Sequence, residues 1–108
     1  MFRVSGSTIA ITRGDTGIFT LVLNDSQGAP YDFSNDEVLF TVKKTVQDTD
    51  VLIQKRIIYG ENVTILPVDT SQLPYGSYVY DIQVTTAGGI VDTVITPSPF
   101  VVKEEVTF

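Results

Sequence analysis

The stretch that decides the fold is Gly76-Ser77-Tyr78-Val79-Tyr80-Asp81-Ile82-Gln83-Val84. Large apolar residues occupy every second position in its second half. Successive side chains of a β-strand point to opposite faces, so this period of two predicts a strand with one buried and one solvent-facing side. The residues assigned to the buried side are Tyr78, Tyr80, Ile82 and Val84.

A turn-forming segment, residues 69–76, comes just before this strand and contains Leu73, Pro74 and Gly76. A leucine, a sharp glycine-containing turn and a Tyr-x-Tyr entry into a strand resemble the tyrosine corner of immunoglobulin-like domains. The resemblance implies that the chain passes here from one β-sheet to another.

The rest of the chain has the same character, with turn signals about every ten residues and no segment that predicts more than a single helical turn, at residues 69–73. Strands are expected up to residue 11 and over residues 18–23, 37–44, 51–59, 63–66, 76–86, 90–95 and 100–108. The fold class predicted from this spacing is all-β, an immunoglobulin-like antiparallel β-sandwich of 7-9 short strands. One domain, 1-108, accommodates it.

Glycine and proline define the ends of several expected strands. The sequence 87–89 predicts a tight hairpin turn, because paired glycines adopt positive φ at little cost. Pro67 is expected to end the strand before it, and Pro97-Ser98-Pro99 to interrupt the chain before its last strand, since proline has no N–H to contribute to a ladder.

Composition excludes several classes of protein. Seven Lys and Arg stand against thirteen Asp and Glu, a net charge of -6, so nucleic acid is not an expected partner. The absence of cysteine rules out a disulfide-stapled scaffold. No apolar run is long enough for a signal peptide or a membrane span, so we expect no membrane partner and assembly in a cytoplasm.

Catalytic chemistry has few residues to draw on. Without histidine or cysteine, Ser-His and Cys-His dyads and zinc sites with nitrogen or sulfur ligands are excluded. Paired carboxylates remain, but all lie among polar neighbours that would not desolvate them. They are Asp48 with Asp50, Asp36 with Glu37, and Glu104 with Glu105. We therefore predict no enzyme, no cofactor and no metal, and leave open a weak oxygen-ligand site formed across loops.

Two further features have both a structural and a functional interpretation. Arg13-Gly14-Asp15 spells the integrin-binding tripeptide, but its place between two expected strands favours a turn. Tyr31, Tyr59 and Tyr75 are the aromatic residues free to form a platform for a carbohydrate. Packing at the rim of the core is the interpretation favoured for them.

Five segments spread over the chain share features with a known group of proteins. They are Thr12-Arg13-Gly14-Asp15-Thr16, Phe40-Thr41-Val42-Lys43-Lys44, Leu52-Ile53-Gln54-Lys55, residues 69–82, and Phe100-Val101-Val102-Lys103-Glu104-Glu105-Val106-Thr107. In these the chain resembles small immunoglobulin-like proteins of phage and prophage tail-baseplate modules of Gram-positive bacteria, nearest to the amino-terminal domain of upper baseplate proteins. The resemblance implies a rigid β-module that docks on other virion proteins, often as an oligomer. Upper baseplate proteins usually continue beyond such a domain, so the end of this chain at Phe108 implies an accessory protein.

The interpretation is a noncatalytic phage or prophage virion structural protein, a tail or baseplate accessory that acts by protein-protein assembly. Its expected partners are other tail and baseplate proteins or further copies of itself. Val22, Leu39 and Val79 lie opposite the expected core positions and are the predicted protein interface. Alternatives are a β-sandwich module that binds carbohydrate or a host receptor through the three tyrosines, and an enzyme that uses carboxylates alone.

Overall fold

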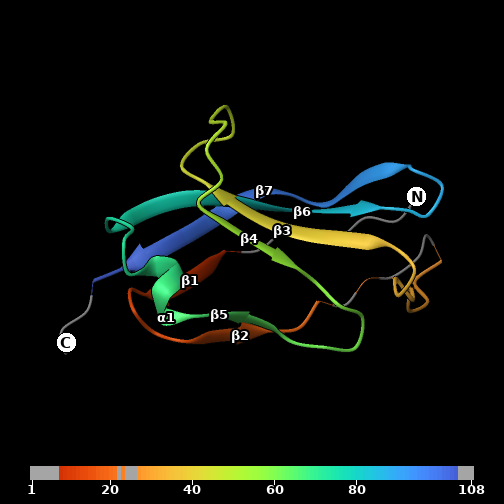
Figure 1. Ribbon diagram of the computed structural model, residues 1–108, viewed down its shortest axis with the longest axis horizontal. Helices are drawn as coiled ribbons and strands as arrows, with labels where there is room; N and C mark the ends of the chain where they lie inside the picture. Colours follow the sequence, from red (N-terminus) through yellow and green to blue (C-terminus); the bar gives the residue numbers. More distant parts are fainter. Residues whose placement is uncertain (1–7, 22, 24–26, 105–108) are drawn as a thin grey trace.

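The computed structural model describes residues 8–21, 23 and 27–104, and the fold of this part is all-β (Figure 1). Strands account for nearly all of its regular structure, as the sequence predicts. In chain order the elements are β1 (Ile9–Thr12), β2 (Gly17–Phe19), β3 (Glu37–Lys43), β4 (Ile53–Arg56), β5 (Val63–Ile65), α1 (Pro67–Thr70), β6 (Gly76–Thr85) and β7 (Val91–Lys103).

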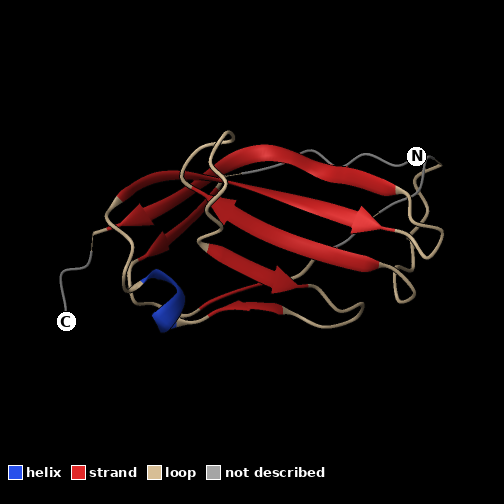
Figure 2. Cartoon of the chain, turned by 45° about the horizontal axis from the view of Figure 1, so that its top comes forward, coloured by secondary structure: helices blue, strands red, loops and turns tan. Residues whose placement is uncertain are grey.

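The strands form two sheets that lie as separate layers (Figure 2). The larger sheet has the order β1-β7-β6-β3-β4, and the smaller one pairs β2 with β5. The prediction of a wholly antiparallel fold is wrong in one place, because β1 runs parallel to β7. These two strands lie far apart in sequence, so no hairpin fixes their relative direction.

The alternation that decides the fold is confirmed in β6. Its inward side chains are at most 3% exposed, and so are those of β3, which pairs with β6 along its whole length. The inward residues of the two strands are Tyr78, Tyr80, Ile82 and Val84 on β6, and Val38, Phe40 and Val42 on β3.

Aromatic contacts join the two layers. The ring of Phe40 on β3 meets Phe19 of the smaller sheet edge-on, with centroids 5.4 Å apart. The same ring lies 5.5 Å from Tyr80 on β6 and 6.2 Å from Phe100 on β7. Such pairs contribute roughly 0.5–1.5 kcal/mol beyond the area that they bury. In a chain without cysteine, this cluster ties the sheets together.

The strand expected over residues 18–23 is shorter than predicted. β2 ends at Phe19 because its partner β5 begins at Val63, so the ladder has only three residue pairs. Leu23 still packs in the core, at 1% exposure. Likewise, the strand expected over residues 51–59 is shorter in the structure, where β4 spans only Ile53–Arg56.

The break expected at residues 97–99 is also wrong, because β7 continues through Pro97 and Pro99. Within the described part of the chain, β1 pairs with β7 only from Phe100 onward, so the preceding part of β7 has β6 on one side alone. A proline that lacks its N–H is tolerated beside a free edge. The expected turn at residues 87–89 does connect β6 to β7.

Tyr78 has the geometry expected of a tyrosine corner. Its hydroxyl donates a 2.5 Å hydrogen bond to the carbonyl oxygen of Pro74, four residues upstream. The Lys44 ammonium lies 4.6 Å from the ring centroid, and Leu73 is buried beneath the turn. Burial raises the pKa of the Tyr78 hydroxyl, which therefore stays protonated and able to donate.

Tyr78→Phe tests the contribution of this hydrogen bond. The change keeps the buried ring and removes the hydroxyl that donates to Pro74, so we expect the free energy of unfolding to fall by about 1–2 kcal/mol. Urea denaturation measures it. Tyr59→Phe is the matched control, since its ring is exposed, and it should change stability little. Equal stabilities for the two variants would contradict a stabilising corner.

Candidate functional site

A polar groove of about 230 Å³ lies on the outer face of the larger sheet, on the side away from the core. Its floor is formed where β4, β3 and β6 run side by side. Thr41 is paired with Gln54 on one side and with Asp81 on the other. These three side chains face outward because their neighbours in sequence face the core.

The groove opens where β7 is irregular. Tyr80 pairs with Ser98 and Ile82 pairs with residue 95, so β7 has two residues, 96 and 97, where β6 has only Asp81. This is a β-bulge, which bends a strand and interrupts its pairing. Asp81 therefore pairs with Thr41 of β3 but has no ladder partner on β7, and Pro97 of the bulged segment lines the groove with it.

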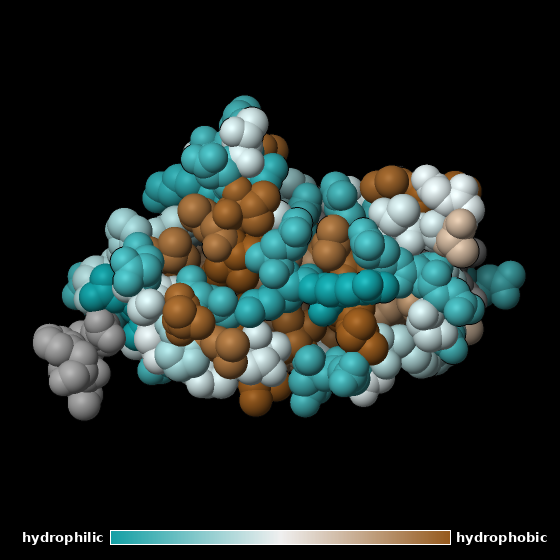
Figure 3. Space-filling model, viewed as in Figure 1, coloured by the Kyte–Doolittle hydropathy of each residue, from teal (hydrophilic) through white to brown (hydrophobic). Residues whose placement is uncertain are grey.

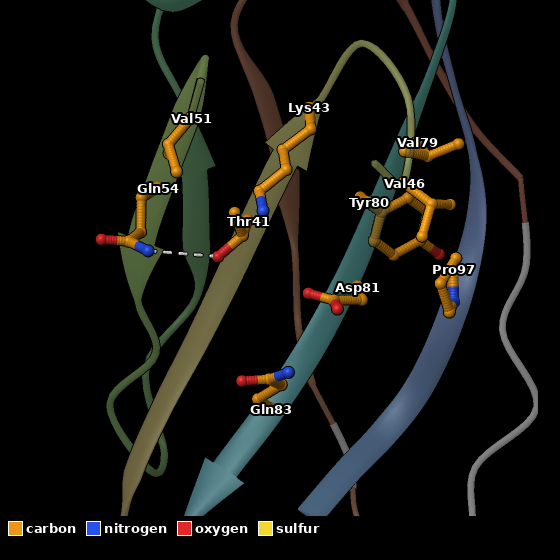
Figure 4. A pocket seen from close by; sticks show the side chains of 10 residues that line it. All are labelled: Thr41, Lys43, Val46, Val51, Gln54, Val79, Tyr80, Asp81, Gln83 and Pro97. Atoms are coloured by element: carbon orange, nitrogen blue, oxygen red, sulfur yellow. Dashed lines mark hydrogen bonds between the residues drawn. The ribbon is translucent and has the colours of Figure 1, made fainter. Parts of the chain in front are cut away.

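Hydrogen-bond donors and hydrogen-bond acceptors both surround the groove (Figure 4). The Gln54 amide donates a 3.2 Å hydrogen bond to the Thr41 hydroxyl. At the other end, the Gln83 amide donates a 3.4 Å bond to the hydroxyl of Thr93. The Lys43 ammonium and the Asp81 carboxylate point into the same space (Figure 4). The groove thus presents a positively charged donor, Lys43, and a negatively charged acceptor, Asp81. Its amide and hydroxyl side chains can both donate and accept hydrogen bonds.

Asp81 supplies the carboxyl group among the residues that line the groove. It is half-buried, and desolvation raises its pKa, while the positive charge of Lys43 opposes the shift by lowering it. Among the side chains that the structure describes, which leave out those of residues 95 and 96, none donates a hydrogen bond to this carboxylate. A carboxylate that has lost water without gaining a donor is ready to accept one from a ligand.

The structure places two of the three predicted interface residues, and both lie on the outer face of the larger sheet. Val79 lines the groove, and Leu39 lies on the same outer face beside Gln83. Both are half-buried, and the register places them four residue pairs apart, roughly 13 Å along the strands. Val22 lies outside the described residues. A role for these residues in protein contact remains a prediction.

Sequence reasoning missed the apolar rim of the groove. Val46 and Val51 belong to the β3–β4 connection, which stands above the sheet in Figure 1. Residues 45–50 of this connection are mostly polar. Val46 lies in a loop, which has no periodicity to predict a wall, and Val51 falls within the strand expected over residues 51–59.

The three predicted platform tyrosines do not share one surface. Tyr59 packs edge-on against Phe33, with centroids 5.1 Å apart, just beyond the end of β4 that pairs with the start of β3. Tyr31 lies near the same end, where its hydroxyl donates a short hydrogen bond to Asp36. Tyr75 precedes β6 at the opposite end of β3, roughly 20 Å away.

Arg13-Gly14-Asp15 serves the fold as a turn. The Arg13 guanidinium donates a 2.9 Å bond to the Tyr75 hydroxyl and lies over its ring. Gly14 has φ 84° and donates its N–H to the hydroxyl of Thr70, which is fully buried. The tripeptide is therefore held against α1 and the turn before β6.

A second surface stands out on the smaller sheet and α1. Ile18 is 64% exposed, Leu66 45% and Val68 70%. Thr64 is the direct partner of Ile18, which places Leu66 on the neighbouring diagonal position of the same face. Figure 3 shows hydrophobic residues over α1 and the adjoining strands. We call Ile18, Leu66 and Val68 the apolar patch.

Other candidate chemistry finds little support in the described part of the chain. No group of three or more acidic side chains that could hold a metal ion occurs there. Of the predicted acidic pairs, Asp36 accepts the Tyr31 hydroxyl bond, and Glu105 lies outside the described residues. Among the same residues, no helix is long and apolar enough to cross a bilayer.

Comparison with known proteins does not assign the chain to a family. No protein-family model and no curated protein matches it. Any assignment of function therefore rests on the fold, the groove and the apolar patch.

Asp81→Asn tests the desolvation of this carboxyl group. Its raised pKa means that ionisation weakens the folded state as pH rises, so the amide should be more stable than aspartate near pH 7. We expect a gain below about 1 kcal/mol, because water still reaches the group. The gain should vanish below about pH 3.9, where the carboxyl is protonated in the folded and unfolded states alike.

Thermal unfolding across pH measures this difference. The matched control is Glu37→Gln, which removes the same charge from an exposed position on β3. A variant Asp81→Asn that is less stable than wild type at neutral pH would show that the carboxylate makes a favourable contact instead.

Proposed function

We propose that this chain is a noncatalytic structural module of a phage or prophage tail or baseplate that acts by protein–protein assembly. It is an immunoglobulin-like β-sandwich, assembled in the bacterial host cytoplasm and carried in the virion. Its partners are other tail or baseplate proteins. Self-association is the alternative, and the experiment below distinguishes the two. The observation that carries the proposal is the apolar patch on a rigid all-β framework.

The strand order supports the immunoglobulin-like assignment. The strands of that fold are lettered A to G in chain order. Strands B and E, the second and the fifth, pair in one sheet, and strands C, F and G are neighbours in the other. Here β2 pairs with β5, and β3, β6 and β7 are neighbours, with β4 added beside β3. The Tyr78 hydroxyl bonds back to the turn that leads into β6, as the tyrosine corner requires.

The apolar patch supports assembly because its three aliphatic side chains are exposed and the acidic residue beside them is already paired. Asp69, the acidic residue beside it, accepts the backbone N–H of Leu66 at 2.7 Å and pairs with Lys55 at 2.8 Å. The negative charge of Asp69 is therefore balanced by Lys55 within the fold. Burying aliphatic surface is favourable by about 25 cal/mol per Å², so a partner that covers Ile18 and Val68 gains from the hydrophobic effect.

Light scattering over a concentration series, together with co-purification of the proteins encoded by neighbouring genes, tests the proposal. We expect Ile18→Lys with Val68→Lys to weaken assembly at least about tenfold, because each lysine places an unpaired charge in the contact. Ile90→Lys is the matched control, since Ile90 is 66% exposed on the β6–β7 turn, outside both surfaces.

The same assay decides between the two surfaces. Loss of assembly in Val79→Lys or Leu39→Lys, with the patch variants unaffected, would assign the contact to the outer face of the larger sheet. A strict monomer that binds no neighbouring tail protein would contradict the proposal. Genes for metabolic enzymes around this one would argue against it as well.

A further inference from the structure

We propose that the groove on the outer face of the larger sheet binds one neutral sugar residue of a glycan. This activity goes beyond assembly and uses other residues than the three tyrosines. The groove faces away from the core on the larger sheet, whereas the apolar patch lies on the smaller one. Assembly through the patch therefore leaves the groove accessible.

The charges in the groove select an uncharged ligand. A cation that approached Asp81 would be repelled by Lys43, and an anion that approached Lys43 would be repelled by Asp81. A sugar hydroxyl avoids both penalties because it donates and accepts hydrogen bonds at once. The amides of Gln54 and Gln83 and the hydroxyl of Thr41 have the same double capacity.

Asp81 is the central acceptor for such a ligand. Its carboxylate has two oxygens to accept bonds from adjacent hydroxyl groups, and hydrogen bonds to an ionised acceptor are the stronger kind. Asp81 and Pro97, which lies on the bulged segment opposite it, both line the groove. Since no described group donates to the carboxylate, a sugar replaces water there and displaces no protein contact.

The walls and the size of the groove fit a sugar ring as well. Val46, Val51, Val79 and Pro97 give aliphatic surface for the C–H face of the ring. The volume of about 230 Å³ suits one hexose, since pockets for drug-sized ligands begin near 300 Å³.

Titration of ¹⁵N-labelled full-length protein with methyl glycosides of glucose, galactose and N-acetylglucosamine tests the proposal. We expect at least one glycoside to shift the amide signals of Thr41, Gln54, Asp81 and Gln83, with a dissociation constant of about 1 mM. N-acetyl-arginine amide and inorganic phosphate serve as charged probes, and neither should bind as tightly.

Two variants and two controls complete the test. Asp81→Asn and Gln83→Ala should each weaken binding about tenfold, because each removes an acceptor from the bound hydroxyls. Glu37→Gln lies outside the groove and should leave the affinity unchanged. Ile18→Lys should also leave it unchanged, so that a failure of assembly and a failure of sugar binding are distinguished.

Three results would overturn the proposal. One is the absence of shifts with all three glycosides up to about 50 mM. Another is binding that shifts residues around Tyr31, Tyr59 or Tyr75 and is lost in their alanine variants. The third is tighter binding of either charged probe, which would make the groove an ion-selective site.

Discussion

The packing of Phe40 is the contact on which the rest of the structure depends. Its fully buried ring meets side chains from β2, β6 and β7, so that one residue contacts both sheets. In a chain without cysteine, no covalent bond holds the sheets at a fixed separation. Dense aromatic packing supplies that constraint, because a tightly packed interior leaves each ring few alternative positions.

This inner constraint determines what the outer surfaces present. Alternate residues of β3 and β6 face inward and pack in the core around Phe40, so the intervening residues of each strand must face outward. Thr41 and Asp81 are brought together by the register that pairs the inward residues. The irregular pairing of β7 then leaves Asp81 without a ladder partner on that strand, because β7 has two extra residues here, one opposite Asp81 and one between the partners of Ile82 and Gln83. One strand register thus determines both which residues form the core and which residues line the groove.

The sequence predicts the regular elements well because their signals are local. Alternation predicts β6 and its inward residues, the spacing of turn signals predicts β3, and the turn before Tyr78 indicates the corner. The continuity of β7 through Pro97 depends on which neighbour lies on each side, and the short β2 depends on where β5 begins. The groove could not be foreseen, because it needs the register between β6 and β7 and the position of the valines in the β3–β4 loop.

The parallel pairing of β1 with β7 has a mechanical consequence. A force that pulls the start of β1 away from the end of β7 acts along both strands and slides them in opposite directions. The four residue pairs from Ile9–Phe100 to Thr12–Lys103 then bear the load together, with the Arg13 N–H bond to Lys103 at their end. A hairpin pulled from its open end would instead lose its bonds one after another. The edge strand β1 and its neighbour β7 therefore form a shear clamp that resists stretching along the chain.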